Sequence, residues 1–139
     1  MTRSTAAARV AAPTLPDRPL RILVGTYEIA GMIPVVGDAF RAQGHHVTTV
    51  VKVRNAWWPD HYDVDFSDRP NDAVSAIEFG HLVANHDVLY FQWARQSWVD
   101  GLHDLPLYRK LGKRIIYCCN GSDVRAGSAF TQLYAHHGL

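Results

Sequence analysis

Residues 20–53 read LRILVGTYEIAGMIPVVGDAFRAQGHHVTTVVKV, and this stretch decides the fold. Its two ends, 20–25 and 45–53, are aliphatic and β-branched runs, which predict two buried strands. Between them, residues 32–43 carry apolar side chains three and four positions apart, as on the buried face of a helix. Gly44 follows as a C-terminal cap. This order of strand, helix and strand predicts a parallel pair with a right-handed crossover.

The same alternation continues along the chain and predicts a doubly wound, Rossmann-like α/β sheet with helices on both faces. Residues 1–19 lack a sustained apolar run and are expected to form a disordered leader before a single domain over residues 20–139. The further elements expected are an irregular segment at 54–70, a helix from an Asn71 cap to about Ala84 with Val74, Ile77, Phe79, Leu82 and Val83 as its apolar positions, a strand at 86–91, a short helix at 102–111, a buried strand at 114–119 and a last helix at 127–137.

The composition excludes several classes of protein. The chain has 139 residues, 47% of them apolar, and a net charge of +1, which gives no argument for a nucleic-acid or anionic-membrane partner. No apolar run reaches the ~20 residues of a transmembrane helix. Cys118 and Cys119 are adjacent in a predicted strand, so they are expected to be reduced core thiols of a cytoplasmic protein. The eight histidines form no HExxH or Cys/His spacing, so neither a metal nor a cofactor is expected.

The loop after the first strand is the first candidate site. Gly25, Gly31 and Gly37 are six residues apart, so the loop lacks both the GxGxxG fingerprint and the Walker signature. This spacing argues against a dinucleotide oxidoreductase and a P-loop hydrolase. Gly31 can let a backbone N–H approach a diphosphate, or it can simply relieve crowding in the turn. Glu28 can accept from or deprotonate a hydroxyl, but a solvated loop carboxylate is the plainer interpretation. Asp38 is expected to face water.

Four tryptophans stand next to predicted strands. Trp57 and Trp58 lie in the irregular segment, where packing under the loop is favoured over stacking on a sugar or a partner. Trp93 and Trp98 follow a strand end and are better placed to line a cleft.

The strongest signal follows the last predicted strand, where the chain reads Asn120-Gly121-Ser122-Asp123-Val124-Arg125. Ligands of open α/β sheets bind at the carboxyl ends of strands, so this turn is a candidate binding loop. Gly121 permits a tight turn, and Arg125 can hold an anion with two hydrogen bonds. The alternative is that Asp123 and Arg125 pair only with each other.

The chain resembles the N-terminal domain of family-4-type glycosyltransferases over residues 20 to 125. The resemblance is carried by RILVG followed by Gly31, by FRAQGHHV at 40–47, by HDVLY at 86–90 and by the run from Asp104 to Arg125. It implies transfer of a sugar from a nucleotide-sugar donor to an acceptor hydroxyl, with retention, in a cleft between two Rossmann-like domains of the GT-B architecture.

The resemblance also implies roles for individual residues. Gly31 would contact the donor diphosphate with Glu28 nearby, while the acceptor side of the cleft is expected to be lined by Glu28, Trp93, Asn120, Gly121, Ser122, Asp123 and Arg125. Asn120 stands where the family often has histidine, and it cannot titrate. Ala30 precedes Gly31 where a glycine pair is common.

The second domain of that family would carry the paired carboxylates and the basic residues that hold the nucleotide. We therefore expect an acceptor-side half, a fragment or a subunit completed by another chain, which is inactive alone. The alternatives are a non-catalytic module that binds a nucleotide or sugar and, third, an α/β enzyme of another class such as an oxidoreductase.

Overall fold

The computed structural model describes residues 16–55, 57, 61–92, 97–99 and 102–119. Within these residues helices and strands alternate as the sequence predicts, except that a short strand, β3, directly follows β2. In chain order they are β1 (Arg21–Tyr27), α1 (Met32–Ala42), β2 (His46–Val53), β3 (Val64–Asp65), α2 (Ala73–Asn85), β4 (Val88–Gln92), α3 (Leu105–Lys110) and β5 (Arg114–Cys118).

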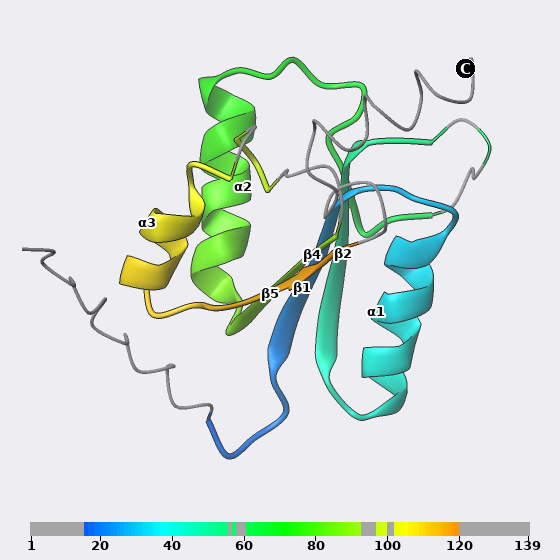
Figure 1. The fold of residues 1–139 in the computed structure, drawn as a ribbon, viewed down its shortest axis with the longest axis vertical. Helices are drawn as coiled ribbons and strands as arrows, with labels where there is room; N and C mark the ends of the chain where they lie inside the picture. The colour runs from blue at the N-terminus through cyan, green and yellow to red at the C-terminus, as the bar shows by residue number, and fades with distance from the viewer. Residues whose placement is uncertain (1–15, 56, 58–60, 93–96, 100–101, 120–139) are drawn as a thin grey trace, which may run out of the picture.

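The five described strands form one sheet in the order β3-β2-β1-β4-β5, and every neighbouring pair is parallel. The chain runs outward from β1 through β2 to β3, then returns to place β4 on the other side of β1. Helix α1 covers one face of the sheet, while α2 and α3 cover the other (Figure 1). The prediction of a doubly wound, Rossmann-like α/β fold is therefore confirmed. The strand order of the sheet reverses between β1 and β4.

Two apolar clusters hold the helices to the sheet, because successive strand residues point to opposite faces. On the α1 face, Ile22, Val24 and Val88 are buried with Ile33 of the helix. On the other face, Leu23 and Leu89 are buried in a larger cluster whose aromatic members are Phe66, Phe79, Phe91, Trp98 and Tyr108. Each fully buried aliphatic or aromatic side chain contributes about 1.5–3 kcal/mol.

The ends of α1 follow the sequence closely. The helix begins directly after Gly31 and ends at Ala42. Gly44 adopts a positive φ of 86° and donates its N–H to the Arg41 carbonyl at 2.9 Å, which satisfies the last turn as predicted for a glycine cap. Asp38 is exposed, as expected, and pairs with Arg41.

Helix α2 differs from its prediction at its cap and on its surface. Asp72, and not Asn71, is the N-cap, and its carboxylate accepts from the Ser75 N–H at 2.9 Å. Val74 and Ile77, predicted as apolar positions of the buried face, are 68% and 73% exposed. The buried stripe follows Ser75, Phe79 and Val83, and at about 100° per residue Ile77 lies on the opposite side of the helix.

The edges of the sheet also depart from the prediction. The two-residue strand β3 forms inside the segment expected to be irregular. Strand β5 was expected to be buried, but it is an edge strand that is half-buried, with Ile116 40% exposed. Cys119 is exposed and Cys118 half-buried, so the prediction of two core thiols is wrong for Cys119, because no further described strand covers this edge.

The chain before β1 is attached to the fold from Pro16 onward. Arg18 donates to both carboxylate oxygens of Asp87 at 3.0 and 2.9 Å, and the Arg21 N–H adds a bond of 2.8 Å. The described structure thus begins four residues before the predicted domain boundary at Leu20. Residues 1–15 of the predicted leader lie outside the described residues.

Candidate functional site

The candidate site lies at the carboxyl edge of the sheet, where the strand order reverses between β1 and β4. Connections from neighbouring strands leave such a point in opposite directions, which opens a crevice that ligands occupy in doubly wound folds. Four parts of the described chain meet this edge: the turn after β1 (28–31), the end of β2, Gln92 at the end of β4, and residues 97–99. Their polar groups decide what this edge can bind.

Glu28 is fully buried, directly after β1. One carboxylate oxygen accepts from the Met32 N–H in the first turn of α1 at 2.9 Å, and the other accepts from the Tyr62 hydroxyl at 2.9 Å. The plainer prediction, a solvated loop carboxylate, is therefore wrong. The positive end of the helix dipole and two donors compensate the buried charge. Glu28 holds the turn in place, and neither oxygen is left as a base.

Tyr62 is a site residue that the sequence analysis missed. It reaches Glu28 from the segment between β2 and β3, and the Arg54 guanidinium lies 5.8 Å above its ring. Arg54 also forms an ion pair with Asp65 of β3. This pair, with its hydrogen bond, raises the pKa of the exposed Arg54 and keeps it charged. A single aromatic residue in an irregular segment gave no signal that it would contact Glu28.

Gly31 is the N-cap of α1 and adopts a left-handed conformation with a φ of 73°. A glycine supplies no side-chain cap, and within the described residues the N–H groups of Gly31 and Ile33 have no acceptor. Both N–H groups can therefore serve a ligand oxygen. The Met32 N–H is already shared between Ile29 and Glu28. A diphosphate at Gly31, as expected from the resemblance, would meet the negative charge of Glu28.

Gln92 ends β4 and is the least satisfied polar residue of the described edge. It has no exposed surface, and neither its amide nitrogen nor its amide oxygen has a hydrogen-bond partner among the described residues. Leaving such a group unpaired costs about 1–3 kcal/mol. Most buried polar groups in native proteins are hydrogen-bonded, so an unpaired buried amide calls for an explanation. Gln92 was not predicted as a site residue, although a glutamine at the end of the apolar run VLYFQ was the available signal.

On the opposite face of the sheet, Asp104 organises residues 97–99. Its carboxylate accepts from the Ser97 hydroxyl, from the N–H groups of Trp98 and Val99 at 2.9 and 3.1 Å, and from the Tyr108 hydroxyl at 2.6 Å. Burial raises the pKa of Asp104, but these hydrogen bonds outweigh it and hold the pKa below 3.8. The cluster is saturated, so its role is structural.

Two further bonds tie residues 97–99 to the sheet. The Thr26 hydroxyl donates to the Ser97 carbonyl at 2.6 Å, and the Lys52 ammonium donates to the Trp98 carbonyl at 2.6 Å. The Trp98 ring is stacked on Phe79 in the larger core cluster, with 4.7 Å between ring centroids. The prediction that Trp98 lines a cleft is therefore wrong, because the Asp104 bonds fold the ring into the core.

The other predicted site residues are only partly described. Trp57 is 86% exposed, so the expectation that it packs under the loop is wrong. Trp58 and the cleft-lining candidates lie outside the described residues, and their roles stay predictions. Those candidates are Trp93, Asn120, Gly121, Ser122, Asp123 and Arg125.

The remaining titratable groups near the sheet are structural. The His86 ring is buried, 2.6 Å from the Leu82 carbonyl and 2.8 Å from the Thr48 hydroxyl, and its burial lowers its pKa. Burial and Cys118 raise the pKa of Tyr90 to about 12. Across the described ranges, no three His, Cys, Asp or Glu side chains gather as metal ligands. The helices described are also all too short or too polar to cross a membrane.

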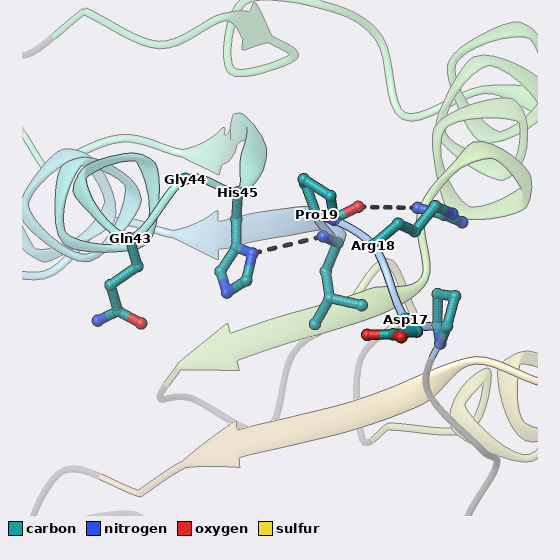
Figure 2. Close-up of a pocket in the computed structure, with 8 residues that line it drawn as sticks. Asp17, Arg18, Pro19, Gln43, Gly44 and His45 are labelled. Carbon is teal, nitrogen blue, oxygen red and sulfur yellow. Dashed lines mark hydrogen bonds between the residues drawn. The ribbon is translucent and has the colours of Figure 1, made fainter.

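A pocket of about 390 Å³ lies at the opposite, amino edge of the sheet, between residues 16–20 and 43–45 (Figure 2). The Leu20 N–H donates to the His45 ring at 3.4 Å across it, and Arg18 turns away to bind Asp87. Two prolines, Leu20 and Gly44 line it together with polar side chains, and none of those polar side chains is both buried and unpaired. It lies at the edge that doubly wound folds do not use for ligands, so it is not the candidate site.

Comparison with known proteins gives no assignment, since no family model, no curated protein and no solved structure matches the chain.

Proposed function

We propose that this chain is the acceptor-side half of a glycosyltransferase, which transfers a sugar from a nucleotide-sugar donor once a second domain or subunit completes the cleft. One observation carries the proposal. Among the described residues, the carboxyl edge at the strand-order reversal holds a fully buried, unpaired amide, Gln92, on the same edge as the unpaired N–H groups of Gly31 and Ile33 at the α1 terminus. This is where a Rossmann-like domain binds its ligand.

The proposed role of this half is to position the acceptor. Gln92, Gly31 and Ile33 offer hydrogen bonds that can fix an acceptor hydroxyl, and such fixing lowers the entropic part of the barrier. Glu28 holds the turn that presents these groups. The turn at residues 120–125, with Trp93, is proposed to line the same cleft. The paired carboxylates and the groups that stabilise the departing diphosphate would come from the second domain. The proposal keeps the cytoplasmic location expected from the sequence.

Binding of a nucleotide-sugar to the 139-residue chain tests the proposal. We would titrate UDP-glucose, GDP-mannose and ADP-glucose separately into labelled protein and record amide chemical shifts. Because this half is proposed to hold a sugar through its hydroxyls, the sugar ring of each probe is expected to change the signals of Gly31, Ile33, Gln92 and residues 120–123, with no change around His45 at the amino edge. The absence of change at saturating concentrations of all three would contradict the proposal. Sugar transfer by the chain alone would contradict the claim that it is one half of an enzyme.

A non-catalytic nucleotide- or sugar-binding module is the second candidate. It is favoured by the absence of a free base at the described edge, because the Glu28 and Asp104 carboxylates are both fully engaged. The two candidates differ in their need for a partner. A second domain or subunit that restores transfer supports the enzyme, while tight binding that no partner converts into transfer supports the module.

A further inference from the structure

We propose that the carboxyl edge formed by Gln92 and the first turn of α1 recognises a pair of adjacent hydroxyls on a neutral saccharide ring, and that Glu28 excludes phosphate from it. This inference deepens the proposed function and rests on it, because it names the ligand class of the same edge. A saccharide hydroxyl would then bind at Gly31, where the resemblance implies the donor diphosphate.

Strand alternation places Gln92 on the α1 side. Val88 and Tyr90, two and four residues earlier, belong to the cluster around Ile33, and the Tyr90 ring contacts Phe40 edge-on at 5.9 Å. Gln92 lies about 7 Å further toward the carboxyl edge. Helix α1 runs antiparallel to β4, so this step leads from Phe40 toward its first turn. The amide therefore extends the apolar α1 face up to the N-terminus of the helix.

The chemistry of the amide selects its ligand. Gln92 offers a donor through its NH₂ group and an acceptor through its carbonyl oxygen, and neither is paired with a described residue. Two adjacent hydroxyls donate and accept at once, so they satisfy both atoms. A phosphate only accepts and would leave the amide oxygen unpaired, while an ammonium only donates and would leave the nitrogen unpaired. Gln92 is fully buried, so a bound ring replaces protein atoms that cover the amide now.

The α1 terminus gives the second constraint. The N–H groups of Gly31 and Ile33 have no acceptor among the described residues, but Glu28 places a carboxylate against Met32 in the same turn. This buried charge compensates the helix dipole, which would otherwise attract an anion. A phosphate would lie beside a like charge in a site screened from water. A hydroxyl oxygen accepts from the same N–H groups without that repulsion.

The substitution Gln92→Met tests whether the amide serves a ligand. Methionine has nearly the same shape and removes two unsatisfied polar atoms, so we expect the thermal midpoint to rise by about 3 °C. If Gln92 instead has a structural partner, the midpoint will fall, which would overturn the inference. Gln43→Met, the same change at an exposed residue at the far end of α1, is the matched control and should leave the midpoint unchanged.

Ligand class is tested by titrating methyl α-glucoside, inorganic pyrophosphate and uracil separately into the 139-residue chain. We expect only the glucoside to shift the Gln92 side-chain NH₂ and the Gly31 and Ile33 amides. Its affinity should fall at least about tenfold in Gln92→Met and stay the same in Gln43→Met.

The other outcomes separate this inference from the proposed function. Shifts with pyrophosphate and none with the glucoside would overturn the saccharide assignment and leave the proposed glycosyltransferase half in place. Shifts with uracil alone would overturn it in favour of a nucleobase. No shift at this edge with any of the three probes, or with UDP-glucose, would overturn both.

Discussion

Asp104 and Gln92 are buried polar side chains near the same edge of the sheet, on opposite faces. Asp104 accepts four hydrogen bonds, while neither amide atom of Gln92 has a partner among the described residues. Burial removes both side chains from water, which is unfavourable for each. Only for Asp104 do hydrogen bonds from the protein offset this desolvation cost. The satisfied cluster around Asp104 fixes the structure, whereas the unsatisfied amide of Gln92 is where we propose that a ligand binds.

Among the polar side chains, the largest effect is expected from removing Asp104, the residue whose hydrogen bonds are complete. Asp104→Ala leaves the Ser97 and Tyr108 hydroxyls and two backbone N–H groups without their acceptor. We expect a loss of about 3–4 kcal/mol in the free energy of unfolding, measured by urea denaturation. Asp38→Ala, at an exposed carboxylate, is the control and should cost less than about 0.5 kcal/mol. A similar cost for both substitutions would show that the Asp104 cluster contributes no more than a surface ion pair.

Glu28 shares a feature with each of these two residues. Like Asp104 it is hydrogen-bonded by protein groups, and like Gln92 it lies at the candidate site on the carboxyl edge. Glu28→Leu leaves the Tyr62 hydroxyl without its acceptor and removes the charge that compensates the α1 dipole. We expect about 2 kcal/mol of destabilisation by urea denaturation.

Glu28→Gln is the matched variant, because it keeps an acceptor for Met32 and removes the charge. We expect it to cost about half as much and to let pyrophosphate shift the Gly31 amide. If pyrophosphate remains without effect on this variant, the carboxylate is not what excludes anions.

His86 is another buried polar side chain, and its contribution to stability depends on pH. Its burial lowers its pKa below 6.5, so the unfolded chain binds a proton more readily than the native protein. The contribution of His86 to the free energy of unfolding is complete above pH 6.5. As the pH falls below 6.5, this contribution decreases by up to about 1.4 kcal/mol per pH unit.

Urea unfolding of the wild type and of His86→Phe between pH 5 and 7.5 measures this effect. We expect the stability difference between them to narrow toward low pH. A difference that stays constant across this range would mean that His86 does not titrate as its burial implies.

The smallest expected effect is at Trp57, which is 86% exposed and belongs to neither cluster. Trp57→Ala should change the free energy of unfolding by less than about 0.5 kcal/mol, while Trp98→Ala should cost about 3–5 kcal/mol. Thermal denaturation of the two variants gives this contrast directly. Equal losses would mean that Trp57 packs against the fold after all.

Much of the fold could be predicted because its signals are local. One strand-helix-strand unit is defined by three local signals: the aliphatic run before Gly25, the spacing of Ile33, Val36 and Phe40, and the cap at Gly44. Each signal depends only on residues that are close together in the chain. The candidate site could be predicted less well. Glu28 and Gly31 were found because they follow the first strand, but the pairing of Glu28 with Tyr62 joins residues 34 positions apart.

The amino-acid sequence by itself determined the parallel α/β architecture, the helix ends at Gly31 and Gly44, and the location of the first site loop. Periodicity and caps are properties of neighbouring residues, so they can be read without the fold. Which polar groups are satisfied follows from the tertiary structure, because hydrogen bonding depends on distances between residues far apart in the chain. The fold buries Glu28, places the Trp98 ring in the core and leaves Gln92 without a partner among the described residues.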